Sequence, residues 1–597
     1  MCKFLAMKDF LKMSLATLVG LIAFSIISTL FSLFVLLGIA TLGNSQAKLP
    51  SEGVLKIDMS TFAITEQSME ANPLDMLTNG EKLLTNVGIW DAVQAINAAA
   101  QDPAVRFIYL LPDMAMGGTA QIEEFRAALH NFRESGKAVI SFIENPTNAG
   151  YFLASVSDKV FMTPYEGFMN TFTGISSQMI FLKDILDKIG VNVQLIRHGK
   201  YKSAGEMFIR SSSSKENMEQ NLSMVNSIWD SWGTIIASSR NISTGKLNSL
   251  LDNLRLNSSE DFVKEGLVDE ALSREELGCK LAALYQTDNA DDIKYIAFTD
   301  YVTAKKDAIN LSDKKIAVIF ADGNIVDGKE KQQVAGDRFA RIISKIRKDP
   351  SVGAVVLRVN SPGGSVLASE KIKAELDLLR ENVPVIASYG SYAASGGYWI
   401  SANTDYIFAN AATLTGSIGV FSMIPDFGNT IKNKLHVTIT PVNSNRHSDM
   451  YSMMRPLDKA ETAYMQASVE SIYNKFTSLV SEGRGMSIQD VDNIAQGRVW
   501  TGAEALEIGL VDQIGTLEDA INYAAASIDG VTSLKDVRIE CHPKPLTTID
   551  LILESINGPS EVFAGTALES VENAFRGWDQ SQSGKVYARI PYEITIR

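Results

Sequence analysis

At 597 residues the chain is too long for one hydrophobic core, and we expect about three to four domain-sized units. The net charge at pH 7 is −14 and no basic block is interleaved with aromatic residues, which argues against a nucleic-acid partner. The three cysteines and five histidines lack the spacing of paired ligands, so the sequence predicts neither a disulfide framework nor a metal site.

The N-terminal region is uncharged from residue 13 to residue 47, which is longer than the roughly 20 residues that a membrane-spanning helix needs. Lys3, Lys8 and Lys12 precede it, so the positive-inside rule predicts a cytoplasmic N-terminus and an extracytoplasmic body. The small residues at 44–47 also fit a cleavable signal peptide. Because the apolar run is roughly two to three times longer than a usual signal-peptide core, we favour an uncleaved anchor.

The next part of the chain alternates strand-like and helix-like segments. Apolar side chains recur at helical spacing in the helix predicted over 121–136, which ends at Gly136, a typical helix-terminating residue. The predicted elements are strands over 54–64, 104–112, 138–144 and 158–164 and helices over 89–101, 121–136 and 148–157.

The second half repeats this order at a period of roughly 245 residues, which indicates two similar α/β domains, each with a mostly parallel sheet covered by helices. The repeated elements are strands over 315–326, 352–359 and 383–390, helices over 338–349 and 369–382, and a helix and strand over 395–410. The expected divisions are an anchor over 1–50, domains over 51–310 and 311–540, and an extension over 541–597 containing a predicted helix at 562–575.

Three motifs in the second half place glycines beside small hydroxyl residues after apolar runs: NSPGGS at 360–365, YAASGGYW at 392–399 and TLTGSIGV at 413–420. Ser395 is the candidate nucleophile, because its own N–H and that of Gly396 would be free donors at a helix start. Gly363 or Gly364 would supply another donor. The alternative is a tight packing contact between small residues, since neither glycine motif fits the G-x-S-x-G elbow.

The two halves differ at the positions that carry chemistry. Alignment sets Asn148 opposite Ser395, so the first half lacks the hydroxyl. It also sets Lys202 opposite Arg446, and arginine does not lose its proton at physiological pH. One half therefore has a serine without a lysine, and the other has a lysine without a serine.

The sequence indicates the base that would activate Ser395 less clearly than it indicates the nucleophile. His436, at the head of a predicted strand, and His447 lack the setting of a catalytic triad. A neutral lysine can act instead if burial lowers its pKa. Lys202 is flanked by small and apolar residues, but position alone does not separate it from Lys200, and both also fit a solvated surface loop.

The chain closely resembles the signal peptide peptidase A (protease IV) family in its long, double-domain form, through the motifs NSPGGSVLASE, YAASGGYWIS, TLTGSIGV and KYKSAGE. The resemblance implies two tandem ClpP/crotonase-like domains behind a transmembrane helix and a Ser/Lys dyad. On this pattern Ser395 is the nucleophile, Lys202 the general base and Ser417 the hydroxyl that orients the lysine. Gly396, with Gly363 or Gly364, forms the oxyanion hole, and no cofactor is needed.

The resemblance also implies an endopeptidase that degrades cleaved signal peptides and other apolar peptides at the membrane. The enzyme would lie in the inner (cytoplasmic) membrane with a periplasmic catalytic body, and several copies would form a ring or bowl, such as a tetramer. Alternatives are a catalytically inactive scaffold that binds membrane peptides, a ClpP-like Ser-His-Asp peptidase, and a crotonase-type acyl-CoA enzyme without a serine nucleophile.

Overall fold

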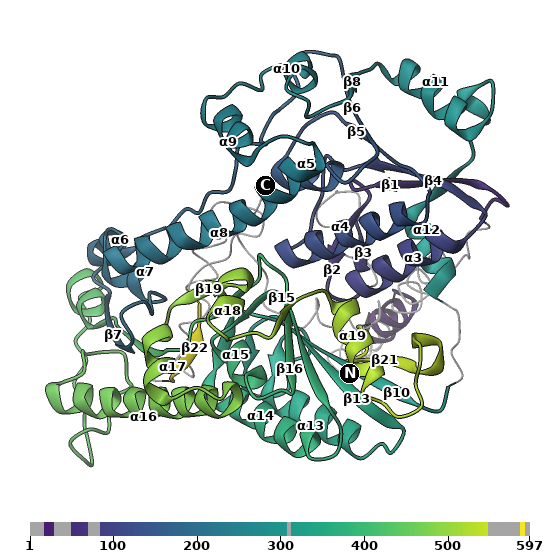
Figure 1. Cartoon of the computed structure of the whole chain (residues 1–597). Coiled ribbons are helices and arrows are strands. Elements are labelled where there is room, and N and C mark those ends of the chain that lie inside the picture. Colours follow the sequence, from purple (N-terminus) through teal and green to yellow (C-terminus); the bar gives the residue numbers. More distant parts are fainter. Residues whose placement is uncertain (1–16, 29–48, 70–83, 307–311, 547–584, 591–597) are drawn as a thin grey trace, which may run out of the picture. The chain divides into compact units, whose positions relative to one another are not determined.

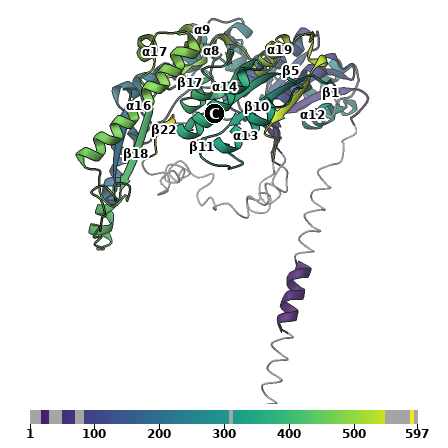
Figure 2. The ribbon, with the colours of Figure 1, turned by 90° about the horizontal axis from the view of Figure 1, so that it is seen from below.

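A computed structural model describes residues 17–28, 49–69, 84–306, 312–546 and 585–590 (Figure 1). Residues 17–28 form a helix with exposed side chains, drawn in purple in Figure 2, in a different compact unit from residues 50–69 and 84–545. The remainder of the anchor predicted over 13–47 lies outside the described residues, as does the helix predicted over 562–575. None of the helices in the described part of the chain has the length and apolar character needed to cross a bilayer.

The first half forms a parallel six-stranded sheet with the strand order β8-β6-β5-β4-β1-β9. Most of its strand residues are buried, as is typical of a parallel sheet covered by helices. The strands are β1 (Gly53–Asp58), β4 (Val105–Leu111), β5 (Val139–Ile143), β6 (Lys159–Met162), β8 (Glu270–Ala271) and β9 (Tyr295–Ala297).

The strand predicted over 54–64 is too long, because the chain turns within it. β1 ends at Asp58, whose carboxylate accepts hydrogen bonds from the N–H (3.3 Å) and hydroxyl (2.6 Å) of Ser60. This side-chain turn is a common way for Asp and Ser to end a strand. The next strand, β2 (Phe62–Thr65), pairs with β3 (Thr85–Gly88) in a separate two-stranded sheet.

The predicted helices of the first half are confirmed, and the apolar face of α4 is buried as expected. Gly136 has a φ of +84° just beyond the end of α4, a conformation that glycine adopts easily. The helices are α3 (Ile89–Gln101), α4 (Thr119–Glu134), α5 (Asn148–Ala154), α6 (Lys183–Ile189), α7 (Glu206–Ile209), α8 (Lys215–Ser239), α9 (Thr244–Asp252), α10 (Ser259–Lys264), α11 (Arg274–Tyr285) and α12 (Phe298–Lys306).

The second half forms an eight-stranded sheet along the path β19-β17-β15-β13-β10-β21, with β16 and β20 branching from β15. The strand predicted over 315–326 is again too long, because it divides at Gly323 into β10 and β11. The sheet contains β10 (Lys315–Asp322), β13 (Val352–Ser361), β15 (Val385–Ala394), β16 (Tyr406–Ala409), β17 (Leu414–Gly416), β19 (Val499–Thr501), β20 (Gln513–Ile514) and β21 (Arg538–His542). β21 runs across the domain boundary expected at residue 540.

The three helices expected from the repeat are confirmed as α13, α14 and α15, and four further helices follow among the described residues that the sequence analysis did not predict. The helices of this half are α13 (Gly336–Arg347), α14 (Val366–Arg380), α15 (Gly396–Ser401), α16 (Lys459–Arg484), α17 (Ile488–Ile494), α18 (Gly502–Glu507) and α19 (Leu517–Ala526). In Figure 1, α3 and α4 lie between the strands of the two halves, and α4 contacts both β5 and β15.

The repeat extends to individual hydrogen bonds. The Tyr151 hydroxyl donates to the carbonyl oxygen of Leu267 at 2.5 Å, and the Tyr398 hydroxyl donates to that of Leu510 at 2.8 Å. The first bond joins α5, which follows β5, to the segment Leu267-Val268-Asp269. The second joins α15, which follows β15, to the segment Leu510-Val511-Asp512. The chain therefore contains two tandem α/β domains, whose boundaries stay a prediction.

A third sheet combines strands from both halves in the order β12-β11-β14-β22-β18-β7. β7 (Asn192–His198), from the first half, pairs antiparallel with β18 (Val420–Asp426) from the second. The other strands are β11 (Ile325–Val326), β12 (Val334–Ala335), β14 (Gly363–Ser365) and, from the C-terminal region, β22 (Tyr587–Arg589). This pairing carries the segment that follows β7, which contains Lys202, to the second half.

A buried ion cluster also joins the two halves. Arg358 on β13 lies 2.7 Å from a carboxylate oxygen of Glu66 and 2.8 Å from one of Glu124, both from the first half. All three side chains are at most 1% exposed. Removal of one member would leave a buried charge without its partner, which is costly in such surroundings.

Candidate functional site

The structure brings together the two side chains that the sequence analysis placed in the dyad and the hydroxyl expected to orient the lysine. Lys202 Nζ lies 2.7 Å from Ser395 Oγ, 2.9 Å from Ser417 Oγ and 3.1 Å from the Ser417 carbonyl oxygen. Lys202 comes from the loop between β7 and α7, Ser395 from the end of β15, and Ser417 from the turn between β17 and β18. All three residues are buried. The lysine and the serine thus meet across 193 residues of sequence.

Ser395 occupies a sharp turn between β15 and α15. Its φ of +56° and ψ of −110° lie outside the regions that residues with a Cβ atom normally adopt. Such backbone strain persists only where the surroundings impose it, and it occurs often at functional sites. The Ser395 N–H donates to the carbonyl oxygen of Gly416 at 2.8 Å, so the expectation that this N–H is a free donor was wrong. The backbone N–H of Gly396, at the first position of α15, is then the remaining candidate at this helix start for a donor to the substrate oxyanion.

The amine of Lys202 is hydrogen-bonded to uncharged groups. Its hydrogen-bonding partners are two hydroxyl groups and one carbonyl oxygen, and among the described residues no carboxylate forms an ion pair with it. Burial lowers its pKa well below the ordinary value of 10.5, because the charged ammonium loses its hydration. The surroundings therefore favour the neutral amine, which can accept a proton.

A glycine of the second half determines how closely the lysine segment approaches. Gly497 has a φ of +77°, and a Cβ atom there would lie only 2.6 Å from Lys202 Cβ. The neighbouring Gln496 carbonyl oxygen accepts a hydrogen bond from the Tyr201 N–H at 2.9 Å. On the first-half side, the Arg197 guanidinium donates to the Lys202 carbonyl oxygen at 2.7 Å. The lysine backbone is thus held on both sides.

The structure separates Lys202 from its sequence alternatives. Lys200 is exposed, with Nζ 5.1 Å from the centre of the Tyr201 ring. Arg446, the aligned counterpart of Lys202, is 79% exposed and lies near Asp458. Of the two candidate lysines, Lys202 alone is in contact with Ser395.

The five histidines all lie in described parts of the chain, and none of them is hydrogen-bonded to Ser395. The His198 ring stacks on Tyr473 with centroids 3.8 Å apart, and His447 Nδ1 lies 2.8 Å from a carboxylate oxygen of Glu461. The strand predicted to begin at His436 is wrong, because residues 435–443 are exposed and form no strand.

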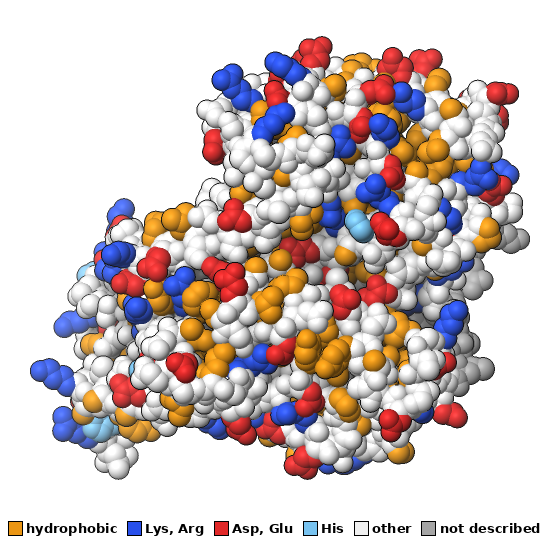
Figure 3. Space-filling model, viewed as in Figure 1, with side chains coloured by type: hydrophobic (Ala, Val, Ile, Leu, Met, Phe, Trp, Pro, Cys, Tyr) orange, Lys and Arg blue, Asp and Glu red, His pale blue; other side chains and the backbone are white. Residues whose placement is uncertain are grey.

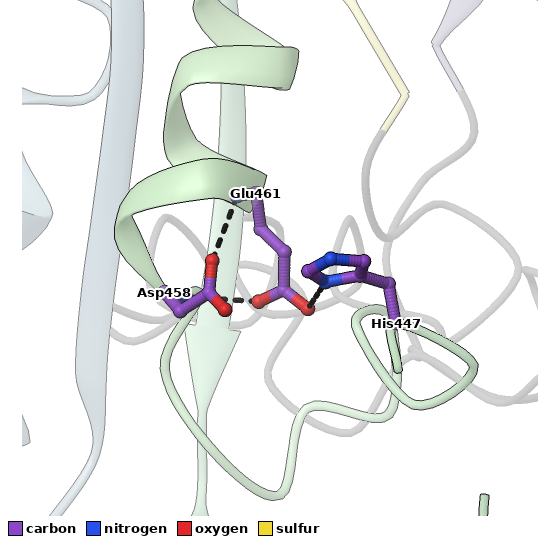
Figure 4. Close-up of side chains that lie close together, drawn as sticks. All are labelled: His447, Asp458 and Glu461. Atoms are coloured by element: carbon purple, nitrogen blue, oxygen red, sulfur yellow. Dashed lines mark hydrogen bonds and ion pairs between the residues drawn. The ribbon is translucent and has the colours of Figure 1, made fainter. Parts of the chain in front are cut away.

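His447, Asp458 and Glu461 lie close enough together to resemble a metal site (Figure 4). Their carboxylates, however, already serve other partners. The Glu461 N–H donates to Asp458 and the Asp458 N–H donates to Glu461, which caps the start of α16. Arg455 donates to both Glu461 oxygens at 2.7 and 2.8 Å and thereby lowers the pKa of that carboxyl. The cluster is therefore explained as a helix cap beside an arginine.

The predicted oxyanion glycines face one another. Gly363 has a φ of +98°, and its N–H donates to the Ser361 hydroxyl oxygen at 3.2 Å. The Gly364 nitrogen lies 3.0 Å from the position that a Cβ atom would take at Gly396. Because side chains at these glycines would fill the space between the segments, the absence of Cβ atoms is what lets the two backbones approach.

The roles of two glycines and one strand in the site were missed from the sequence. The Gly419 carbonyl oxygen lies 3.4 Å from Ser395 Oγ, and Gly497 packs against Lys202. Gly497 stands in the segment AQGRVW, where nothing in the local pattern distinguishes it from an ordinary turn glycine. The strand β22, beside the glycines of β14, was also missed, because a three-residue strand leaves no periodic signal.

Comparison with known proteins gives the family. Peptidase family S49 matches residues 131–288, which include Lys202, and residues 377–530, which include Ser395 and Ser417. A Protease 4 of Haemophilus influenzae is 34% identical over 539 residues, covering 86% of each chain. A Protease 4 of Salmonella typhi is 32% identical over 567 residues, covering 92% of this chain and 90% of the relative. A putative signal peptide peptidase SppA of Enterococcus faecium is 37% identical over 217 residues, covering 35% of this chain and 63% of the relative.

The two family matches fall in the two halves of the repeat, one in each α/β domain. The two Protease 4 relatives align along most of the chain, so the likeness is not confined to the motifs around Ser395. These comparisons confirm the predicted family: the chain belongs to peptidase family S49 and is a serine peptidase.

Proposed function

We propose that this chain is an endopeptidase in which Ser395 is the nucleophile and Lys202 is the general base. The observation that carries the proposal is the 2.7 Å separation between Lys202 Nζ and Ser395 Oγ at a buried site. A serine hydroxyl becomes an effective nucleophile only when a neighbouring base accepts its proton. A lysine with a lowered pKa fits that role, and the positions of the histidines do not favour a Ser-His-Asp alternative.

The proposed reaction has two stages. Neutral Lys202 takes the hydroxyl proton as Ser395 Oγ attacks the peptide carbonyl carbon, and the resulting ammonium gives that proton to the leaving amine. This step leaves an acyl-enzyme ester on Ser395 and a neutral lysine. The same amine then takes a proton from water, the resulting hydroxide attacks the ester, and Ser395 regains its proton as the acid product leaves.

Two further groups support these steps. The Ser417 hydroxyl, 2.9 Å from Lys202 Nζ, is proposed to orient the amine towards Ser395. The Gly396 N–H, with an N–H from the glycine pair at 363–364, is proposed to hold the oxyanion of the tetrahedral intermediate. Gly364 is the better candidate of that pair, because the Gly363 N–H already donates to Ser361.

The proposed substrates are cleaved signal peptides and other apolar peptides. A buried apolar cluster that includes Ala394, the residue before Ser395, joins the two halves and contains Met224 and Ile228 of α8 with Leu414 and Val499 of the second sheet. The name of the Enterococcus faecium relative, signal peptide peptidase, agrees with this substrate class for that protein. The net charge of −14, and acidic and basic side chains interspersed on the face in Figure 3, support the proposal that nucleic acid is not a partner.

We further propose that residues 13–47 anchor the enzyme in the inner (cytoplasmic) membrane, with the N-terminus in the cytoplasm and the catalytic body in the periplasm. The uncharged run and the preceding lysines support this arrangement. Confining enzyme and apolar substrate to one surface raises their effective concentration.

A homo-oligomeric ring or bowl is also proposed, with a tetramer as one such form. It is supported by an exposed segment between β18 and α16 in which Leu435, Val437, Ile439 and Val442 are each about half exposed or more. Contiguous exposed apolar side chains of this kind commonly mark a protein–protein contact.

The test of the dyad compares Ser395→Ala and Lys202→Ala with Lys200→Ala in the full chain, using an internally quenched apolar peptide. We expect the first two changes to lower kcat/KM by roughly 10³-fold or more, as removal of a catalytic group does, and the third to leave it within about twofold. Circular dichroism checks that each variant is folded. Full activity in Lys202→Ala, or equal losses in Lys202→Ala and Lys200→Ala, would refute the assignment of the base.

A further inference from the structure

Helix α8 of the first half lies beside strand β19 of the second half (Figure 1). Gln220 and Ser227 are seven residues apart on α8, about two helical turns, so they lie on one face of the helix. Both residues contact β19. The Val499 N–H donates to Gln220 Oε1 at 3.3 Å, and the Ser227 and Thr501 hydroxyl oxygens lie 2.6 Å apart. This face of α8 therefore joins the two halves by hydrogen bonds.

The amide of Gln220 also contacts both neighbours of Lys202. Gln220 Nε2 donates to the Tyr201 carbonyl oxygen at 3.2 Å and to Ser203 Oγ at 2.9 Å. A third acceptor, Asn217 Oδ1 on the same helix, lies 3.2 Å from this nitrogen and shares its two hydrogens. Gln220 is 1% exposed, so these bonds are shielded from water. One side chain thus holds the chain before and after the lysine.

Backbone groups determine which way round this amide lies. The Val499 N–H can only donate, so the atom that faces it must be the amide oxygen. The Tyr201 carbonyl can only accept, so the atom that faces it must be the amide nitrogen. A carboxylate at this position would lack the donors, and an apolar side chain would lack both ends. The site therefore requires the amide group of Gln220.

The strand that Gln220 contacts also holds the backbone of the two serines. Val499 is paired with Gly416 where β19 runs antiparallel to β17. The Gly416 carbonyl oxygen accepts the Ser395 N–H at 2.8 Å. The Ser417 N–H donates to the carbonyl oxygen of the residue before Val499 at 2.7 Å. The glutamine therefore links the segment of the proposed base to the segments of the nucleophile and of the orienting hydroxyl.

We propose that Gln220 is a positioning residue for Lys202: its amide fixes the lysine segment against β19 and thereby keeps the amine beside Ser395 and away from water. This inference rests on the proposed function, since it takes Lys202 as the general base. Gln220 acts through the backbone on either side of the lysine. Without the amide, the buried Tyr201 carbonyl and Val499 N–H would lose their partner, so the segment would have to shift or admit water. Water beside the amine would raise its pKa towards the ordinary value, because burial is what lowers it.

The experiment compares three changes in the full chain. Gln220→Met keeps the length and approximate volume of the side chain but removes the amide. Gln220→Asn keeps the amide on a side chain one carbon shorter, which cannot span both segments. Ser227→Ala is the matched control, because it removes another hydrogen bond between α8 and β19, at the end of the strand opposite Val499. For each protein, kcat and KM for an internally quenched apolar peptide are measured over a pH series that reaches about 10.5, the ordinary pKa of lysine.

Rates are expressed per folded molecule, with the folded fraction measured by circular dichroism. We expect both Gln220 variants to lower kcat at neutral pH by about tenfold or more with KM within about twofold, because the base is displaced while the peptide site is intact. The pH at which kcat is half-maximal should rise by about one unit or more, so that part of the lost kcat returns at high pH. Ser227→Ala should keep the kcat and the pH midpoint of the parent.

A purely structural role for Gln220 would reduce the amount of folded protein and leave the kcat of each folded molecule and its pH midpoint unchanged. That result would overturn the inference. Equal effects of Gln220→Met and Ser227→Ala would overturn it as well, because any bond between α8 and β19 would then be sufficient. A parent protein without peptidase activity, or full activity in Lys202→Ala, would instead refute the proposed function on which the inference rests.

Discussion

Replacement of Gly497 by alanine tests whether the placement of Lys202 governs the rate. A Cβ atom at Gly497 would lie 2.6 Å from Lys202 Cβ and 2.7 Å from the Lys202 backbone nitrogen. Ordinary carbon contacts begin at about 3.5 Å, so one of the two segments must move by about 1 Å. A displacement of that size at a reacting group lowers the rate by roughly 10²-fold, equivalent to about 2.7 kcal/mol of barrier.

Gly485→Ala is the matched control. Gly485 ends α16 with a φ of +63°, and a Cβ atom there would have no heavy atom within 4 Å. Both substitutions therefore carry the backbone cost of a left-handed residue, about 1 to 2 kcal/mol, but only that at Gly497 collides with the lysine segment. The control isolates the effect of displacement from the effect of backbone strain.

The assay is kcat for an apolar fluorogenic peptide, expressed per folded molecule after measurement of the folded fraction by circular dichroism. We expect Gly497→Ala to lose about 10²-fold in kcat and Gly485→Ala to stay within about twofold. If folded Gly497→Ala kept the parent kcat, the geometry around Lys202 would not control the reaction and its role as the base would be refuted.

Burial lowers the pKa of Lys202, and the proposed mechanism uses the neutral amine. We therefore expect kcat/KM to fall as pH falls through that pKa and to reach its plateau well below pH 10.5. A rate still climbing at about pH 10 would contradict a buried base. Arg358→Met leaves two buried glutamates without their cation. We expect it to lower the free energy of unfolding, measured by denaturant titration, by roughly 3 to 5 kcal/mol. A loss under about 1 kcal/mol would mean that the cluster does not hold the halves together. Tyr398→Phe and Tyr151→Phe each leave one leucine carbonyl oxygen without its donor and should each cost about 1 kcal/mol; a large effect in one half alone would show that the duplicated bonds are not equivalent.

The elements that the sequence predicted well are those with a strong local pattern. α3 begins and ends where the apolar periodicity over 89–101 does, and the apolar face of α4 is buried. The strands over 54–64 and 315–326 were predicted too long for one shared reason. Apolar residues continue past Asp58 and Gly323, so the apolar pattern does not indicate that the chain turns there. The turn after Asp58 depends on a hydrogen bond from Ser60 to the Asp58 carboxylate, and the turn at Gly323 depends on its φ of +102°.

The candidate site was only partly predictable. Ser395 stands out because its glycines and the adjoining helix start are local, and the comparison of the two halves singles out a serine in one and a lysine in the other. The choice between Lys200 and Lys202 was open, because both share one loop and similar neighbours. It depends on which of them is buried when β7 pairs with β18, a contact between segments far apart in the chain.

Local composition and internal repetition were thus sufficient to predict two α/β domains and the serine beside its glycines, and the resemblance carried by four motifs indicated the family. Folding was needed to bring Lys202 within 2.7 Å of Ser395, to press Gly497 against the lysine, and to lay Ala588 over the glycines of β14. The physical reason is that apolar periodicity and turn chemistry act over a few residues. Burial, which lowers the lysine pKa, and long-range strand pairing, which positions it, arise only when distant segments pack together.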